Sequence, residues 1–339
     1  MSASVELRVV INPAARNGAF FREWGAIRGK VFRSLKLSPA RTEMLIPESR
    51  EEMERVVCET LRLKIPRLMI VGGDGTFSSA VQGCLDLHLG ESVDQLGTTF
   101  CFFPGGRGND FFRSLTGRNF RSADALRAAA FDLLETGEGL ETDLMRVTWK
   151  TEDGRVSRRA CLNVASFGFT GAVAHRVNSQ ADWLKKTPLG NSAATYGLQA
   201  LRAASQYARE EIRVLVDGKE VSCGQYLMGV VLNGGFNGGG LHWSRSAKLD
   251  DGLIDLLLIE GANPYAVLRA VPGVLAGEWE GIPGVQMFRA KKIQIERLGP
   301  TLRTPFWETD GEQSEPAGLR VTELECIPRA IRVLRRKQG

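Results

Sequence analysis

Two glycine-rich segments that contain aspartate stand between predicted strands and predicted helices. Gly72-Gly73-Asp74-Gly75-Thr76 follows the apolar run Arg67–Val71, and Pro104–Asp110 (PGGRGND) follows Thr99–Phe103. Glycines let backbone N–H groups approach a phosphate without Cβ clashes, and a helix N-terminus adds partial positive charge. An aspartate in such a loop would repel phosphate unless a divalent cation lay between them. Asp74 therefore predicts Mg²⁺-dependent phosphate chemistry, although the pentapeptide alone also fits a glycine turn with Asp74 as a helix cap.

Neither loop matches the common nucleotide-binding motifs. The chain has no Gly-Lys-Ser/Thr of a Walker A loop and no G-x-G-x-x-G fingerprint in the required context. This argues against an ordinary P-loop NTPase and an NAD dehydrogenase. Because ligands of open α/β sheets bind at the carboxyl ends of the strands, both loops are expected to face one crevice.

Two acidic turns lie in the second half of the chain, Asp250-Asp251-Gly252-Leu253 and Thr309-Asp310-Gly311-Glu312. Asp-Gly is a frequent hairpin signature, so each segment alone reads as a plain turn. The chain has only 3 histidines, and carboxylates are therefore expected to carry the chemistry.

The elements that position these residues change character at about residue 140. Before it, strand, loop and helix alternate, and the capping box Ser49-x-x-Glu52 opens a helix with apolar residues at helical spacing. After it, Asp153-Gly154 and Asp217-Gly218 separate β-rich runs, with one helical stretch at Asn191–Arg209. The pattern predicts an α/β domain with a mostly parallel sheet, then an antiparallel β-sandwich, with the active site in the cleft between them.

The expected boundaries are residues 1–140 for the α/β domain that carries the two glycine loops and 141–327 for the β-rich domain. Residues from about 328 to 339 form a segment able to return to the first domain.

Composition narrows the class of protein. The chain has 339 residues, 43% apolar and 24% charged, with a formal net charge of +5. Six scattered cysteines without a CxxC pair argue against a zinc site or a disulfide framework. No apolar run approaches the roughly 20 residues that cross a bilayer, and the N-terminus lacks a signal-peptide pattern. We expect a cytoplasmic protein in peripheral contact with the inner face of the membrane, with no nucleic-acid partner; a homodimer is left open.

These pieces together resemble a known family. The order of the motifs is that of diacylglycerol-kinase catalytic-domain proteins, above all the bacterial soluble lipid kinases, with sphingosine and ceramide kinases as relatives. The segments that carry the resemblance are Asn12-Pro13, Gly72–Thr76, Pro104–Asp110 with Phe111 and Arg113, Asn163 with Gly168-Phe169, Asn233 with Gly238–Gly240, Asp250–Leu253 and Asp310–Glu312.

The resemblance implies a lipid kinase that binds ATP and Mg²⁺ in the interdomain cleft and phosphorylates a hydroxyl of a membrane lipid, most simply diacylglycerol. The first domain would then bind the nucleotide and the second the lipid substrate. Asp74 would help to hold the catalytic ion, Asp310 would be the general base, and Asp110 would organise the cleft wall with Asn109 and Arg113. The residues implied in nucleotide binding are Asn12, Gly72, Gly73, Asp74, Gly75, Thr76, Gly106, Arg107, Asn109 and Glu312. The resemblance also implies a structural Mg²⁺ held by Asp251 and the Leu253 carbonyl, with Asp250 as a neighbour.

Two positions depart from the family pattern, and one tryptophan is singled out. Arg107 replaces a common threonine, and Phe112 replaces a small residue. Arg107 reads either as a phosphate clamp or as a side chain that pairs with Asp110 or Asp74 or points to solvent. Trp183, beside two lysines, is the candidate membrane anchor.

The acceptor is left open by the sequence. Diacylglycerol, phosphatidylglycerol, a sphingoid base and ceramide all fit, because acyl-chain pockets are built from generic apolar residues. A kinase of a soluble alcohol such as NAD is the second hypothesis. A catalytically silent lipid- or nucleotide-binding protein is the third, and the presence of all the expected carboxylates argues against it.

Overall fold

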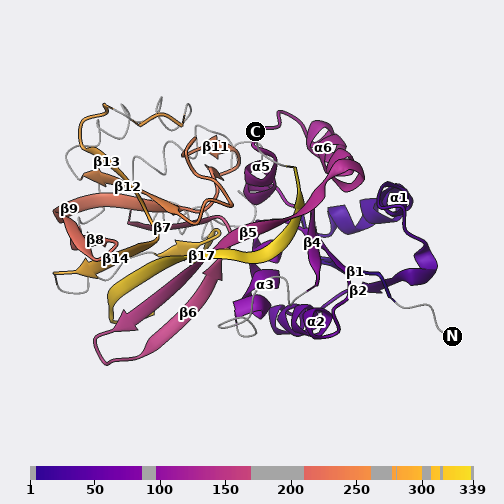
Figure 1. The fold of residues 1–339 in the computed structure, drawn as a ribbon, viewed down its shortest axis with the longest axis horizontal. Coiled ribbons are helices and arrows are strands. Elements are labelled where there is room, and N and C mark those ends of the chain that lie inside the picture. Colours follow the sequence, from indigo (N-terminus) through magenta and orange to yellow (C-terminus); the bar gives the residue numbers. More distant parts are fainter. Residues whose placement is uncertain are drawn as a thin grey trace.

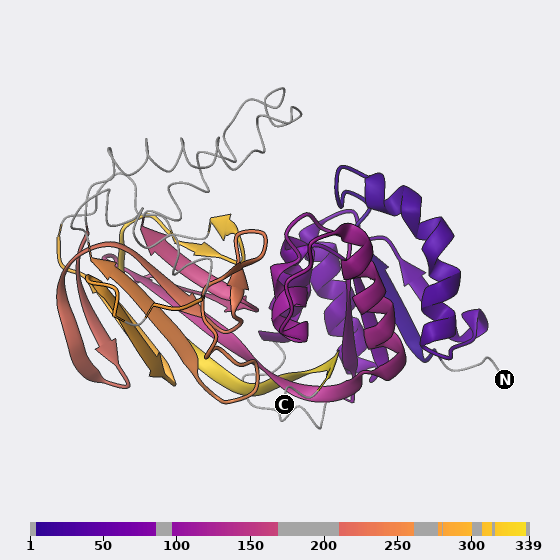
Figure 2. The ribbon, with the colours of Figure 1, turned by 90° about the horizontal axis from the view of Figure 1, so that it is seen from above.

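The computed structural model describes residues 5–85, 97–168, 210–260, 277–279, 281–299, 307–313 and 316–336. Within them the chain forms two lobes that meet along a pair of long strands (Figures 1 and 2). The predicted helical stretch Asn191–Arg209 and the candidate anchor Trp183 lie outside the described residues.

The N-terminal lobe is a parallel sheet between two layers of helices. Its elements are β1 (Leu7–Ile11), α1 (Ala19–Ser34), η1 (Pro39–Arg41), β2 (Thr42–Leu45), α2 (Arg50–Arg62), β3 (Arg67–Gly72), α3 (Asp74–Leu85), β4 (Thr99–Pro104), α5 (Asp110–Thr116) and α6 (Ala123–Thr136). Strands β2, β1, β3 and β4 lie in that order and pair in parallel. Helices α1 and α6 pack on one face, and α2 and α3 on the other (Figure 1). The predicted parallel α/β domain is confirmed.

Local sequence explains these elements. Strand β1 is buried along its whole length, as expected of a central parallel strand covered on both faces. Helix α2 begins at the predicted capping box, where the Ser49 hydroxyl accepts the Glu52 N–H at 3.1 Å. Its buried residues Met53, Val57 and Leu61 form one face and pack on the sheet.

The second lobe is built from antiparallel strands. They are β5 (Glu138–Thr151), β6 (Val156–Cys161), β7 (Val164–Gly168), β8 (Glu210–Val216), β9 (Lys219–Leu232), β10 (Phe236–Asn237), β11 (Leu241–His242), β12 (Ile254–Glu260), β13 (Val285–Ala290), β14 (Lys292–Arg297), β15 (Glu308–Thr309), β16 (Glu312–Gln313) and β17 (Leu319–Arg335). The pairs β7–β9, β8–β9, β9–β12 and β14–β17 are all antiparallel. The predicted antiparallel β-sandwich is confirmed.

Strands β5 and β17 join the two lobes. They pair antiparallel from end to end, with irregularities between Leu319 and Val321 and between Ile327 and Ile331 of β17. At its far end β17 also pairs in parallel with β4, with Arg332 opposite Thr99 (Figure 1). Strand β5 continues through residue 140 without a break, so the domain boundary expected there stays a prediction.

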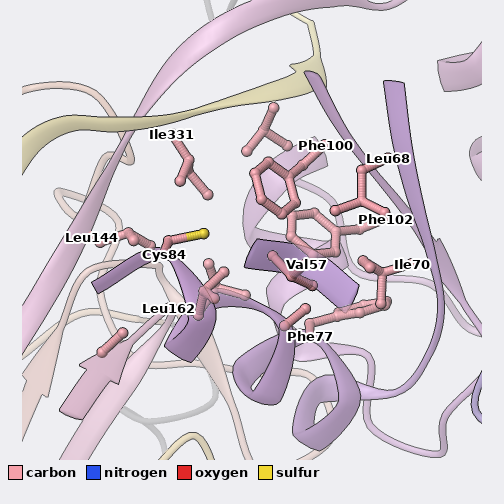
Figure 3. Close-up of a cluster of buried hydrophobic side chains, with 14 of the residues drawn as sticks. Val57, Leu68, Ile70, Phe77, Cys84, Phe100, Phe102, Leu144, Leu162 and Ile331 are labelled. Atoms are coloured by element: carbon pink, nitrogen blue, oxygen red, sulfur yellow. The ribbon is translucent and has the colours of Figure 1, made fainter. Parts of the chain in front are cut away.

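One hydrophobic core extends across both lobes. Phe77 and Phe102 of the first lobe share a cluster with Leu144, Leu162 and Ile331 of the long strands and the second lobe (Figure 3). Close packing of this kind transmits displacement rather than absorbing it. The edge of the sheet that carries the glycine loops is therefore held in a fixed relation to the second lobe.

Candidate active site

The two glycine loops lie against each other, backbone to backbone. The Gly72 carbonyl accepts the Gly105 N–H at 2.6 Å. A Cβ on Gly73 would lie 2.9 Å from the Gly106 Cα, and a Cβ on Gly106 would lie 2.5 Å from the Gly73 Cα. Non-bonded carbon atoms prefer about 3.5–4.0 Å, so neither position has room for a side chain. The contact fixes the spacing of the two loops.

Asn109 ties the second loop together from within. It has a positive φ of 53° and is buried. Its Oδ1 accepts the Gly106 N–H at 2.9 Å, and its Nδ2 donates to the Gly106 carbonyl at 3.0 Å. The Arg113 Nε donates to the Gly108 carbonyl at 3.3 Å. Both side chains therefore shape the loop.

Asp74 and Asp110 bring their carboxylates together at Gly108. A Cβ on Gly108 would lie 3.0 Å from the Asp74 Oδ2 and 3.3 Å from the Asp110 Oδ2, so a side chain there would have to displace the two carboxylates. The Asp74 Oδ1 accepts the Phe111 N–H at 3.0 Å, so this carboxylate holds the start of α5. Burial, then the charge of Asp110 and, less, that of Asp310 raise the pKa of Asp74 to about 6, against the opposing backbone hydrogen bonds.

Asp110 is held by a loop of the second lobe. Its Oδ2 accepts the Gly239 N–H at 2.9 Å, and its Oδ1 accepts the Gly240 N–H at 2.7 Å. Burial raises the pKa of Asp110, although these N–H groups and Arg113 oppose the rise. The segment Gly238–Gly240, which in the sequence contributed only to the family resemblance, therefore orients the Asp110 carboxylate of the first lobe.

The Asp310 carboxylate lies over the start of β7. It accepts the N–H groups of Leu162 at 2.8 Å, Asn163 at 2.9 Å and Val164 at 3.2 Å. The Cys161 thiol lies 3.4 Å from its Oδ1. Burial raises the pKa of Asp310 although these backbone donors oppose it. The carboxyl group is therefore fixed in direction and is more basic than an ordinary aspartate.

Glu312 pairs with two arginines from different lobes. One carboxylate oxygen contacts Arg50 of α2, and the other contacts Arg159 of β6. The sequence prediction missed both arginines, because a single arginine in a helix or a strand has no local signature.

The structure has a pocket of about 440 Å³ beside these residues. Among the predicted nucleotide-binding residues, Asn12, Gly73, Gly75, Thr76, Gly106 and Glu312 line it. Ser49 and Arg50 at the start of α2 also contribute to its wall. The Asn12 Nδ2 donates to the Thr76 hydroxyl at 2.8 Å, which connects the end of β1 to the first glycine loop.

The other predicted nucleotide residues lie around the pocket rather than in its wall. Gly72 packs against Thr76, and Asn109 is hydrogen-bonded to Gly106. The Asp74 carboxylate lies beside that of Asp110 at Gly108. Arg107 is exposed, and within the described part of the chain it has neither an ion pair nor a hydrogen bond. It therefore does not pair with Asp74 or Asp110 in this structure.

The predicted structural Mg²⁺ loop has arginine partners. The Asp250 Oδ2 lies 2.6 Å from the Arg335 Nη2, and the Asp251 Oδ2 contacts Arg289. The Asp251 Oδ1 accepts the Leu253 N–H at 3.0 Å. Each of these two carboxylates therefore has a guanidinium partner in this structure, and a structural Mg²⁺ at this loop stays a prediction.

A third carboxylate at this loop had not been predicted. The Asp143 Oδ2 accepts the Gly252 N–H at 2.7 Å, and its Oδ1 accepts the Arg329 N–H at 2.7 Å. Burial raises its pKa, and the charges of Asp251 and Asp250 add to the rise. Asp143 thus connects β5 to the acidic turn and to β17.

The donor chemistry at Asp74 fits a nucleotide-bound magnesium ion. Among the residues that the structure describes, no group of three or more His, Cys, Asp or Glu side chains could by itself hold a metal. Magnesium at nucleotide sites commonly takes one or two carboxylates and completes its shell with phosphates and waters. Asp74 and Asp110 offer such a pair, and their raised pKa values indicate negative charge that the protein leaves poorly compensated.

Comparison with known proteins agrees with this arrangement. The diacylglycerol kinase catalytic domain family matches residues 6–147, and the "YegS C-terminal NAD kinase beta sandwich-like domain" family matches residues 163–335. A "Probable lipid kinase YegS-like" of Chromohalobacter salexigens is 31% identical over 78% of this chain and 72% of its own length. A diacylglycerol kinase of Bacillus subtilis is 25% identical over 67% of this chain and 66% of its own length.

Solved structures show the same fold. The crystal structure of a diacylglycerol kinase from Bacillus anthracis superposes with a TM-score of 0.68 and 18% identity, covering 98% of this chain and 97% of that one. Within the described residues, no helix is both long and apolar enough to cross a membrane.

A parallel α/β lobe and an antiparallel sandwich, with glycine loops and carboxylates gathered at their junction, define a kinase of the diacylglycerol kinase class. Both halves of the chain match families of that class, and a relative at 31% identity spans most of it. The chain belongs to the family of YegS-like lipid kinases.

Proposed function

We propose that this chain transfers the γ-phosphate of ATP, with Mg²⁺, to a hydroxyl of a membrane lipid, most simply diacylglycerol. Phosphatidylglycerol, a sphingoid base and ceramide are related acceptors. The observation that carries the proposal is the convergence of the Asp74 and Asp110 carboxylates at Gly108, close enough to Asp310 for its charge to affect Asp74, next to a pocket lined by Gly73, Gly75 and Gly106. Phosphoryl transfer is catalysed mainly by positioning and charge neutralisation, and these are the parts that it requires.

Asp310 is the proposed general base. A lipid hydroxyl is a poor nucleophile at neutral pH, and a carboxylate that receives its proton as the bond to phosphorus forms is worth typically about 10²–10⁴-fold. Its raised pKa favours this role, because a base works best when its pKa approaches the working pH. Three backbone N–H groups at the start of β7 hold its carboxylate in one orientation.

The glycine loops are the proposed phosphate cradle. Gly73, Gly75 and Gly106 line the pocket, and the absence of side chains there lets a polyphosphate approach the backbone. Asp74 and Asp110 would hold the magnesium ion, which neutralises phosphate charge when it is bound. Exposed Arg107, next to this wall, is a proposed additional contact to phosphate.

The second candidate is a kinase of a soluble alcohol. The family that matches the C-terminal half is described as NAD kinase-like in its sandwich, which favours NAD as the acceptor to compare. A lipid acceptor implies peripheral contact with the membrane, whereas NAD does not.

The test is an acceptor panel. Purified chain is incubated with labelled ATP and Mg²⁺, and with each lipid in mixed micelles or with NAD in solution. Products are identified by mass, with Asp74→Asn as the inactive control and EDTA as the metal control. We expect a phosphorylated lipid only when micelles, Mg²⁺ and Asp74 are all present. Phosphate on NAD and on no lipid would replace the first proposal by the second.

A further inference from the structure

A charged cluster of three side chains, Arg50, Glu312 and Arg159, lies at one side of the pocket, and two of them, Arg50 and Glu312, line it. Glu312 lies between Arg50 and Arg159, and each guanidinium contacts a different carboxylate oxygen. The exposed fractions are 41% for Arg50, 25% for Glu312 and 14% for Arg159. Arg50 belongs to the first lobe and the other two to the second, so the cluster spans the junction.

The cluster lies at the phosphate loop. Arg50 and Glu312 both line the pocket, and a Cβ on Gly75 would lie 3.6 Å from the Glu312 Oε1. The Glu312 carboxylate thus occupies space directly beside the glycine loop that would cradle phosphate. A carboxylate is an anion of similar geometry to one face of a phosphate, and guanidinium groups bind both in the same way.

The positive and negative side chains that line the pocket balance each other. Among the described lining residues the cations are Arg16 and Arg50, and the anions are Glu48 and Glu312. Arg16 is already 3.3 Å from Glu23. A wall that is neutral as a whole does not attract a polyphosphate, whereas one in which Glu312 has moved away exposes two guanidinium groups.

We propose that Arg50 and Arg159 bind the polyphosphate of the nucleotide, and that Glu312 occupies them in the free protein and is displaced when the nucleotide binds. The inference rests on the proposed function for the identity of the nucleotide. The exchange is favoured because a polyphosphate carries more charge than one carboxylate and presents oxygens to the guanidinium groups in the same geometry. Because Arg50 and Glu312 lie on different lobes, the exchange also alters a contact across the junction.

The test measures nucleotide binding without catalysis. ADP and AMP are titrated into the full chain by calorimetry, with EDTA and then with Mg²⁺. Arg159→Ala is expected to weaken ADP binding about tenfold or more, the effect of losing one charge-assisted contact, and to change AMP binding far less. Arg158→Ala is the matched control, because this exposed neighbour on β6 should leave both affinities unchanged. Arg50→Ala, with Arg55→Ala of the same helix as its control, should behave like Arg159→Ala.

Repeating the titrations in a Glu312→Gln protein distinguishes direct contact between Arg159 and phosphate from an effect of Arg159 on the charge of Glu312. In Glu312→Gln, ADP should bind more tightly in EDTA than in wild type, because a competing anion has gone. If Arg159→Ala still weakens ADP about tenfold there, Arg159 contacts phosphate. If the loss vanishes in that background, or is absent in both, the proposal is overturned. Melting curves of each variant exclude unfolding as the cause.

These outcomes are distinguishable from failure of the proposed function. ADP binding that depends on both arginines, with no lipid phosphorylated in the acceptor panel, would leave the inference standing and remove the lipid acceptor. If a lipid is phosphorylated but Arg159→Ala and Arg50→Ala bind ADP as the wild type does, the proposed function stands and this inference is overturned.

Discussion

The contact between the glycine loops makes Gly73→Ala a sharp perturbation. The new Cβ would lie 2.9 Å from the Gly106 Cα, a backbone atom that cannot rotate away. Reaching an ordinary carbon–carbon separation of about 3.5–4.0 Å requires the loops to part by roughly 0.6–1.1 Å. Overpacking of this kind costs about 1–3 kcal/mol. For domains of this size each kcal/mol lowers Tm by about 2–4 °C, so a fall of roughly 2–12 °C is expected.

In Gly73→Ala, kcat should be affected more strongly than Tm. A displacement of about 1 Å between catalytic groups can lower kcat by about 10²-fold, and parted loops would separate Asp74 from Asp110. The assay is calorimetric Tm together with kcat and KM for ATP.

Gly75→Ala is the matched control in the same loop. Its Cβ would lie 3.6 Å from the Glu312 Oε1, an ordinary contact, and it falls within α3, where alanine is favoured over glycine by about 0.5–1 kcal/mol. Its Tm should equal or exceed that of wild type. If Gly73→Ala melts at the wild-type temperature, or Gly75→Ala loses more, the steric reasoning is wrong.

Three further predictions concern charged residues of the site. Asp310→Asn should lower kcat by at least about 10²-fold with ADP affinity retained, measured by steady-state kinetics and calorimetry; near-normal kcat at saturating lipid would remove its role as base. Arg107→Ala should raise KM for ATP several-fold without changing KM for lipid, and Arg107→Thr should recover part of the loss, whereas unchanged ATP kinetics would leave Arg107 no part in nucleotide binding. The pKa of Asp74 is raised from 3.8 to about 6 in the folded protein, so its ionisation destabilises the fold progressively from about pH 4 and fully above pH 6. In EDTA, Asp74→Asn should therefore gain Tm over wild type at pH 7 and little at pH 4, and a difference independent of pH would contradict this assignment.

Features encoded by neighbours in the sequence were predicted correctly. The capping box at Ser49 does begin a helix, and the apolar runs before Gly72 and Gly105 are buried parallel strands. The glycine loops were recognisable because a strand end, two or more glycines and a helix start lie within a few residues. Parallel strands then place such loops at one edge without further information.

Contacts between distant segments could not be predicted in this way. Arg159 reaches Glu312 across 153 positions, and the Gly239 N–H reaches Asp110 across 129. Asp143 likewise binds the Gly252 N–H across 109 positions. Each depends on how the long strands bring the lobes together, and no local pattern of residue types encodes that geometry.

The direction of a carboxyl group's pKa shift helps to distinguish structural carboxylates from carboxylates of a binding site, but only when the location of the group relative to the pocket is also considered. Burial raises the pKa of Glu323, yet Lys150 and Lys292 more than offset it, and the pKa lies below its usual value, as for a structural ion pair. Asp74 has the opposite shift, because burial and neighbouring carboxylates outweigh its backbone donors.

Asp143 shows why the direction alone is insufficient, since its pKa is also raised although its carboxylate binds backbone N–H groups of residues that do not line the pocket. What distinguishes Asp74 and Asp110 is that their carboxylates converge at a glycine, between two loops whose backbones line a cavity. Backbone donors from the second lobe hold Asp110, so the alignment of the acids depends on how the two lobes meet. A ligand that brings positive charge to this junction would relieve the repulsion between the two carboxylates, which is the physical reason to expect nucleotide and magnesium to stabilise this chain together.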